Sequence, residues 1–258
     1  MQALTVSIVQ ADLHWHDAQK NREHFANVLH ELNDQTDLIV LPEMFTTGFT
    51  MDAKLYAESM DGVSVSWMKE MAAEKNASVC GSLIIAEDDK FYNRFICVDP
   101  SGQEAAYDKR HLFRLADEQH HFSAGDKTIS FEINGWRICP MVCYDLRFPV
   151  WSRNRNNYDL LLYVANWPSR RHYAWESLLR ARAIENLSYV VGVNRTGADG
   201  NDIPYTGGSA IIDYTGQELA NLNDQTGVVS KTLDIAALEK FRERFAFHED
   251  ADDFSIVV

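Results

Sequence analysis

Short apolar runs alternate with segments of helical periodicity along most of the chain. Residues 4–9 (LTVSIV) have the apolar character of a buried strand. In residues 18–33, apolar side chains recur at i, i+3, i+4 and i+7, which marks one face of a helix. A second apolar run, DLIVLPE, follows at 37–43 and ends in a proline and Glu43. This order predicts a βαβ unit whose second strand leads into a loop at Glu43.

The same alternation continues toward the end of the chain. Further helices are expected at residues 64–75, 145–155, 171–187 and 235–244. Further strands are expected at residues 77–87, 91–99, 128–132, 136–142, 159–164, 188–193, 208–213 and 227–234. The Asn134-Gly135 pair between two of these strands is typical of a hairpin turn. This order favours an α/β fold of two mixed sheets covered by helices, with two similar halves packed sheet against sheet.

Length and charge narrow the classes of partner. No low-complexity tract or Gly/Ser linker divides the 258 residues, so we predict one domain spanning residues 1–258. The formal net charge is −14, and no basic run offsets it locally. Such a field repels phosphate backbones, which argues against nucleic acid as a partner. A small anionic substrate would need a local cation that works against this field.

The N-terminal region and the cysteines indicate the compartment. The first residues lack a basic segment followed by a long apolar one, and no stretch has the length needed to span a bilayer. Four cysteines lie in apolar, strand-like segments, at Cys80, Cys97, Cys139 and Cys143. We therefore expect reduced thiols in a cytoplasmic protein that does not bind membranes.

The stretch around Cys143 is the strongest candidate for chemistry. An apolar strand runs into Cys143, and a helix-starting sequence follows with Asp145 as the expected N-cap. Such an elbow would place the thiol beside unpaired helix N–H groups, which lower a thiol pKa and can hold an oxyanion. A free cysteine is more often a small buried hydrophobic residue, and this segment alone leaves both interpretations open.

A metal site is the weaker interpretation of the same segment. Cys139 lies four residues before Cys143, but zinc motifs place paired cysteines across a tight turn with further ligands elsewhere. The histidine pairs at 120–121 and at 14 and 16 have no convincing spacing to them. We expect no metal and no cofactor.

Three segments resemble the signature segments of the nitrilase superfamily of carbon–nitrogen hydrolases. These segments are LPEMF around Glu43, YDKRHLFR around Lys109 and VCYDLRFP around Cys143, and they stand in the order typical of the family. Residues 180–195 (RARAIENLSYVVGVNR) and 209–219 (SAIIDYTGQEL) resemble later family segments. The resemblance extends over nearly the whole chain and implies a four-layer α-β-β-α sandwich.

The resemblance implies an active site made of Glu43, Lys109 and Cys143. Cys143 would attack a carbonyl carbon and form a thioester, while Glu43 moves the protons. Lys109 and the backbone N–H of Tyr144 would stabilise the oxyanion, each donor typically by roughly 2.7–4 kcal/mol. Taken singly, Glu43 and Lys109 could instead be a structural ion pair, or a plain strand end and a solvated turn cation. For Lys109 alone this structural interpretation is favoured, because most lysines are surface charges.

Further polar residues are candidates for supporting roles. The family often carries a second glutamate in the loop after the lysine, and Glu118 in LADEQHHF holds that place unless the loop simply faces solvent. Arg147 either contacts the substrate or pairs with a buried carboxylate. Trp167 either lines the mouth of the pocket or belongs to the core. Arg182 lies on an apolar helix face and needs an internal partner such as Glu185.

Within the superfamily, DKRHLFRLADE and CYDLRFPVWSRN look closest to omega-amidases. Those enzymes hydrolyse the terminal amide of 2-oxoglutaramate or 2-oxosuccinamate to a dicarboxylate and ammonia. The resemblance thus implies a small anionic amide, and Arg114, Arg147 and Arg195 are the candidates to hold its carboxylate. A nitrilase, an N-carbamoyl amide hydrolase and a non-catalytic scaffold of the same fold are the alternatives. By analogy with the superfamily, we expect a homodimer or a higher homo-oligomer.

Overall fold

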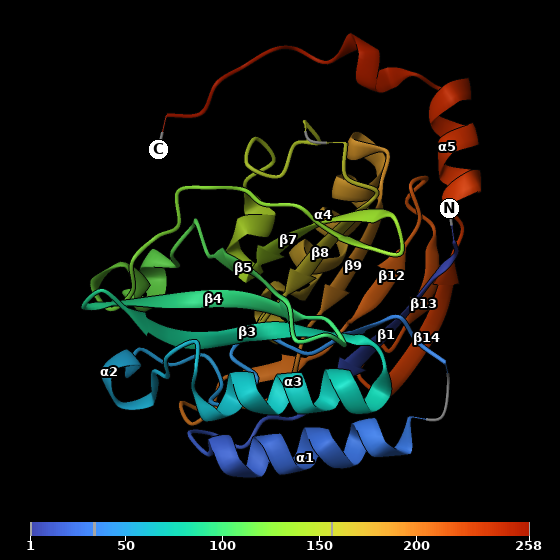
Figure 1. The fold of residues 1–258 in the computed structure, drawn as a ribbon. Coiled ribbons are helices and arrows are strands. Elements are labelled where there is room, and N and C mark those ends of the chain that lie inside the picture. The colour runs from blue at the N-terminus through green and yellow to red at the C-terminus, as the bar shows by residue number, and fades with distance from the viewer. Residues whose placement is uncertain (1, 33–34, 156, 258) are drawn as a thin grey trace.

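The computed structural model describes residues 2–32, 35–155 and 157–257, and it contains two six-stranded sheets (Figure 1). The first sheet has the order β14 (Gly227–Leu233), β1 (Leu4–Gln10), β2 (Leu38–Val40), β3 (Ser78–Glu87), β4 (Lys90–Val98), β5 (Glu104–Asp108). The second has the order β13 (Glu218–Asn221), β12 (Ala210–Ile212), β9 (Tyr189–Val193), β8 (Leu160–Val164), β7 (Trp136–Val142), β6 (Phe131–Ile133). A separate hairpin pairs β10 (Thr196–Ala198) with β11 (Pro204–Thr206). The α-helices are α1 (Ala18–Glu31), α2 (Ala53–Tyr56), α3 (Val63–Lys75), α4 (His172–Asn186) and α5 (Ile235–Arg244).

The two sheets repeat one pattern of strand directions. In the first sheet β1, β2 and β3 are parallel neighbours, while β14, β4 and β5 are added antiparallel. In the second sheet β7, β8 and β9 are the parallel neighbours, while β6, β12 and β13 are added antiparallel. Both sheets are therefore mixed, and the predicted similarity of the two halves is confirmed at the level of architecture.

The sheets pack face to face between layers of helices. Apolar side chains from both sheets, such as Ile8 and Val40 with Met141 and Leu162, form one continuous core. Helices α1 and α3 cover the outer face of the first sheet, and α4 covers the second (Figure 1). Gly192 on β9 permits the close approach of α4, because a Cβ there would lie 2.5 Å from the side chain of Leu179. The four-layer α-β-β-α sandwich is thus confirmed.

Local sequence signals account for where several helices begin and end. The carboxylate of Asp17 accepts the N–H of Lys20 at 3.0 Å and caps α1, whose buried face includes Phe25 and Leu29. Helix α3 ends at Asn76 in the left-handed conformation, with φ of 49°. The predicted helix at 18–33 is therefore present to Glu31, and residues 33 and 34 lie outside the described residues.

Two predicted elements differ from the structure. The strand expected at 128–132 is the shorter β6, which begins at Phe131. The prediction of a helix at 145–155 is wrong, because only a 3-10 helix at Cys143–Arg147 forms there. Pro149 lacks an N–H and cannot continue a helical ladder. Further on, Asn154 exchanges hydrogen bonds with the backbone of Tyr158, which favours a loop.

Within the described residues, no helix has both the length and the apolar character needed to cross a membrane.

Candidate active site

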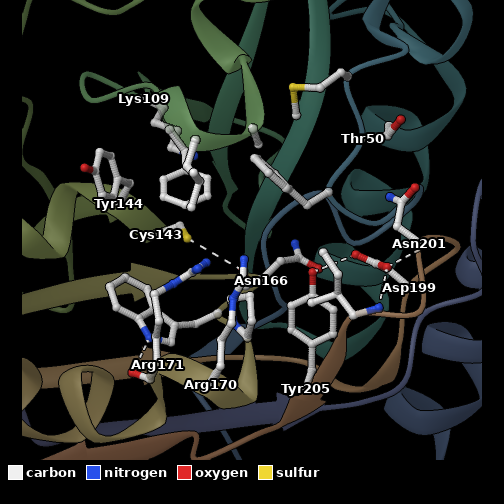
Figure 2. A pocket seen from close by; sticks show the side chains of 18 of the residues that line it. Thr50, Lys109, Cys143, Tyr144, Asn166, Arg170, Arg171, Asp199, Asn201 and Tyr205 are labelled. Atoms are coloured by element: carbon white, nitrogen blue, oxygen red, sulfur yellow. Dashed lines mark hydrogen bonds between the residues drawn. The ribbon is translucent and has the colours of Figure 1, made fainter.

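Side chains from both sheets meet at one end of the sandwich. Glu43 follows β2, Cys143 follows β7, Asn166 follows β8, and Lys109 follows β5. Because the carboxyl ends of parallel strands share one edge of a sheet, residues just after them are brought together. Strands β2 and β8 hold corresponding places in the two halves, so the loops after them face each other. Figure 2 shows the labelled side chains of Lys109, Cys143 and Asn166 around the same cavity.

The carboxylate of Glu43 is held in one orientation by three donors. The side-chain amide of Asn93 donates to Oε1 at 2.7 Å, and Nζ of Lys109 donates to the same oxygen at 3.0 Å. The backbone N–H of Asn166 donates to Oε2 at 2.7 Å. Glu43 has no exposed surface. A carboxylate anchored in this way cannot rotate freely away from the groups beside it.

Lys109 is buried between two carboxylates. Its Nζ lies 3.0 Å from Glu43 and 3.0 Å from both oxygens of Glu118, and all three side chains are fully buried. Burial disfavours the ammonium, but the charges of Glu118 and Glu43 outweigh it and raise the pKa of Lys109. Two buried carboxylates share this one cation, so burial and the charge of Glu43 raise the pKa of Glu118 despite Lys109. Lys109 is therefore charged, and the sequence-based placement of Glu118 beside it agrees with the structure.

Cys143 stands at a strained elbow. Its φ is 45°, a left-handed conformation that is uncommon for a residue with a Cβ. It opens the 3-10 helix, its side chain is half-buried, and Sγ lies 3.9 Å from the backbone oxygen of Asn166. Strain of this kind typically costs about 1–3 kcal/mol and is found mostly at functional positions.

The expected cap at Asp145 is wrong. Val142 is the N-cap, and Asp145 lies inside the 3-10 helix with no exposed surface. Its carboxylate accepts the N–H of Val142 at 3.1 Å and the hydroxyl of Tyr107 at 2.7 Å. Asp145 therefore ties the elbow to the strand that leads to Lys109, because Tyr107 is on β5.

The expected lowering of the Cys143 pKa is also wrong. Burial and the negative charge of Glu43 raise the pKa of this thiol, and the opposing effect of Lys109 is smaller. The thiol is accordingly protonated in the free protein, and a nearby base is needed to take its proton.

A cavity of about 400 Å³ opens onto Cys143, within the range of small-molecule sites. Lys109, Asn166, Tyr144, Arg147 and Trp167 line it, whereas Glu43 and Glu118 lie behind its wall. The three predicted side chains Tyr144, Arg147 and Trp167 therefore face the cavity that contains the thiol.

The other arginines proposed from the sequence lie elsewhere. Arg114 is exposed outside this cavity, and Arg195 is buried in an ion pair with Asp12 at 2.7 Å. The prediction that Arg114 or Arg195 binds the carboxylate of the substrate in this cavity is therefore wrong. The predicted pair of Arg182 with Glu185 is confirmed, at 3.0 Å.

Sequence reasoning missed several residues of the site. Asn93, which holds Glu43, was not singled out, and neither were Arg170 and Arg171, which line the cavity. The adjacent arginines come soon after the predicted strand at 159–164, and this position after a buried strand could have indicated that they lie near the site.

Comparison with known proteins gives the family. The sequence profile described as carbon-nitrogen hydrolase matches residues 5–243. The chain belongs to the carbon–nitrogen hydrolase family, as the resemblance to the nitrilase superfamily implied.

Particular relatives agree with this assignment. The chain is 47% identical over 257 residues to the omega-amidase YafV of Escherichia coli (strain K12), covering 99% of this chain and 100% of that protein. It is 34% identical over 251 residues to the 2-oxoglutaramate amidase of Bacillus subtilis (strain 168), covering 95% and 96%. The solved structure of XC1258 from Xanthomonas campestris, a CN-hydrolase superfamily protein with an arsenic adduct in the active site, matches with a TM-score of 0.97 at 45% identity over 100% of both chains. The chain is thus a carbon–nitrogen hydrolase, and the two curated relatives given above are named as amidases.

Proposed function

We propose that this chain hydrolyses the terminal amide of a small 2-oxo dicarboxylate monoamide, 2-oxoglutaramate or 2-oxosuccinamate, to the acid and ammonia. The observation that carries the proposal is a single constellation. The half-buried thiol of Cys143 faces a cavity beside the buried Glu43, Lys109 and Glu118. A silent scaffold has no need for an ammonium buried between two carboxylates, which is costly to desolvate.

Acylation would use Cys143 as nucleophile and Glu43 as base. The sulfur attacks the amide carbonyl carbon while its proton passes to Glu43. Because the thiol is protonated in the free protein, this transfer accompanies the attack. Collapse of the tetrahedral intermediate breaks the C–N bond, Glu43 returns the proton to nitrogen, and ammonia leaves a thioester on Cys143.

In deacylation water would be the nucleophile and the sulfur of Cys143 the leaving group, with Glu43 again as the base. Water gives a proton to Glu43 and its oxygen attacks the thioester carbon. The acid departs, and the sulfur takes the proton back from Glu43. In both halves the ammonium of Lys109 and the backbone N–H of Tyr144 stabilise the oxyanion, while Glu118 holds Lys109 in place. Tyr144 is in the first turn of the 3-10 helix, where N–H groups have no partner inside the helix.

The choice of substrate is supported by relatives and by charge. Relatives that cover nearly the whole chain are named omega-amidase and 2-oxoglutaramate amidase. Arginines that line the cavity suit a substrate with a carboxylate, although the chain as a whole has a net charge of −14. We further propose that the chain acts as one domain in a homodimer or larger homo-oligomer in the cytoplasm, as the family resemblance implies.

A panel of amides tests the proposed function. Ammonia release is measured with 2-oxoglutaramate, glutamine, asparagine, simple nitriles and N-carbamoyl amino acids. The expected result is the highest kcat/KM for 2-oxoglutaramate, together with a covalent adduct of its acyl group on Cys143 in enzyme quenched during turnover. A preference for nitriles or carbamoyl amino acids would contradict the proposed substrate class. Turnover without an adduct would contradict the proposed thioester intermediate.

Asn93 provides a second test, because its side chain contacts Glu43 from outside the cavity. Its amide donates to Oε1 of Glu43 at 2.7 Å, accepts the hydroxyl of Ser82 at 2.8 Å, and does not line the cavity. Asn93→Ala removes a hydrogen bond to a charged group, so kcat is expected to fall roughly 10- to 100-fold. KM is expected to stay within about 3-fold, because no substrate contact is lost.

The matched control is Asn186→Ala, a buried asparagine at the end of α4 whose amide bonds the backbone of Arg182 at 3.0 Å. That change is expected to lower thermal stability and leave kcat unaltered. A wild-type kcat in folded Asn93→Ala would show that Glu43 does not depend on this hydrogen bond.

A further inference from the structure

Three arginines line the cavity without a carboxylate partner. Among the ion pairs and hydrogen bonds of the described residues, none joins the guanidinium of Arg147, Arg170 or Arg171 to an acidic side chain. In the view of Figure 2, Cys143 lies between Lys109 on one side and Arg170 and Arg171 on the other. Like charges gathered without a direct carboxylate partner raise the energy of the empty site, and an anionic guest relieves that repulsion.

Buried arginines elsewhere in the chain do have carboxylates. Arg94 pairs with Asp108 at 2.7 Å, and Arg195 pairs with Asp12 at 2.7 Å. The buried arginines are thus neutralised by carboxylates, whereas the three cavity arginines, which are half-buried or exposed, keep their charge available to a guest.

Aromatic rings hold two of the three guanidinium groups. The guanidinium carbon of Arg171 lies 4.8 Å from the ring centre of Phe113, and that of Arg147 lies 5.0 Å from the ring centre of Trp167. Stacking uses one face of the planar group and leaves its in-plane N–H donors free. Those donors form the fork that binds both oxygens of a carboxylate. The two groups are thus oriented without being neutralised.

The supports place this pair relative to the reacting groups. Phe113 is in the loop between Lys109 and Glu118, and its N–H bonds Glu118. Trp167 directly follows Asn166, whose N–H bonds Glu43. Because each aromatic ring shares its loop with a residue that contacts the catalytic carboxylates, the distance from the arginines to the thiol is set by the fold.

Arg171 is the better placed of the two. It is half-buried, whereas Arg147 and Arg170 are exposed. Burial lowers the pKa of Arg171, and the neighbouring charge of Arg170 adds to this effect. Among the described residues that line the cavity, the acids are Asp52 and Asp199, and neither pairs with these arginines. Asp199 already accepts the hydroxyl of Tyr205 at 2.9 Å and the N–H of Asn201 at 2.8 Å.

We propose that Arg171 is the main anchor for the carboxylate of the substrate, with Arg147 as the second arm of the clamp. The proposal rests on the proposed function and names the residues that decide its specificity. The same cations disfavour an ammonium beside that carboxylate. The clamp therefore selects 2-oxo acid amides over glutamine, which has an ammonium where 2-oxoglutaramate has a carbonyl oxygen.

Arg171→Met with two matched amides tests the clamp. The pair is 2-oxoglutaramate and pentanamide, a neutral amide with the same number of carbons. For the anionic amide kcat/KM is expected to fall roughly 10- to 100-fold, mainly through KM, because charge-assisted hydrogen bonds are lost. For pentanamide it is expected to change less than about 3-fold. Arg171→Lys keeps the charge without the fork and is expected to lie between.

Discrimination against glutamine is an independent readout of the same variant. Glutamine is a zwitterion, so Arg171→Met removes an attraction and a repulsion together, while 2-oxoglutaramate loses an attraction only. The ratio of kcat/KM for 2-oxoglutaramate to kcat/KM for glutamine is therefore expected to fall. Arg147→Met is expected to act in the same direction with a smaller change, because its guanidinium is exposed.

Arg244→Met is the control, since Arg244 is exposed on α5, stacks over Phe245 at 5.0 Å and does not line the cavity. It is expected to behave as wild type on both amides. An equal loss on both amides in Arg171→Met, or no loss on either, overturns the clamp. If wild-type enzyme hydrolyses pentanamide with the same kcat/KM as 2-oxoglutaramate, the clamp is contradicted and the proposed amidase function is not. Wild-type enzyme inactive on both removes the proposed function as well.

Discussion

Cys143→Ala is expected to abolish ammonia release from 2-oxoglutaramate, with kcat at least about 10⁴-fold below wild type. The reason is that Cys143 supplies the sulfur of the proposed acyl intermediate, and Lys109 beside it cannot take over as nucleophile. Lys109 is held as an ammonium by two carboxylates, and its nitrogen has no free electron pair for attack. The measurement is ammonia release at saturating substrate, with the melting temperature recorded for each variant.

The fold is expected to survive this substitution. Alanine keeps the Cβ that already occupies the left-handed conformation at this position, so backbone strain does not change. The side chain is half-buried beside a cavity, and its removal leaves no sealed void.

Cys139→Ala is the matched control. Cys139 is four residues earlier on the same strand, is 3% exposed and packs in the core between the sheets. Its truncation is expected to cost about 1 kcal/mol of folding free energy and to leave kcat unaltered. Loss of turnover in both variants would point to a joint role of the two thiols, as in the metal-binding alternative.

Lys109→Met is expected to damage both turnover and stability. The variant loses an oxyanion donor, so kcat is expected to fall about 10²- to 10³-fold. It also leaves Glu43 and Glu118 buried together without their cation, and breaking a buried ion pair typically costs about 3–5 kcal/mol. Urea unfolding and steady-state kinetics measure the two effects separately.

The stability loss in Lys109→Met should depend on pH in a definite direction. Burial already raises the pKa of Glu118 in the wild type, and removal of the ammonium raises it further. A carboxyl whose folded pKa is above its unfolded value takes up a proton on folding. Its stabilising protonated form is present at low pH and is lost as pH rises through the folded pKa. The deficit relative to wild type is therefore expected to be smaller at about pH 5 than at about pH 8.

Two further variants make this prediction specific. The double variant Lys109→Met, Glu118→Gln removes one of the two buried negative charges. It is expected to be more stable than Lys109→Met without recovering turnover. Lys240→Met changes an exposed lysine on α5 and is expected to alter neither. Wild-type stability in the Lys109→Met single variant would mean that the buried cation does not hold the two carboxylates together.

Much of the site could be predicted from short segments. Glu43 and Cys143 each come directly after a strand, and Lys109 follows β5, so nearby residues determine their local backbone. The motifs around these three residues also identified the family, and the four-layer fold followed from it. Their catalytic roles, the single domain, the homo-oligomer and the cytoplasmic location stay predictions.

Other features could not be found in this way, because the contacts behind them are distant in sequence. Asn166 holds Glu43 across 123 positions, and Asn93 reaches it across 50. Asp145 has the composition of a helix cap, but it is drawn into the elbow by Val142 and by Tyr107 on another strand. Local propensity gives no weight to such partners.

By itself, the sequence determined the alternation of strands and helices, the family, and the three residues at which chemistry is expected. Those features depend on hydrophobic periodicity and on motifs only a few residues long. Only the tertiary structure decided which arginines enter the cavity, and that the Cys143 pKa is raised and not lowered. Both depend on burial and on charges brought together from separate loops, and Coulomb interaction and desolvation act through space, not along the chain.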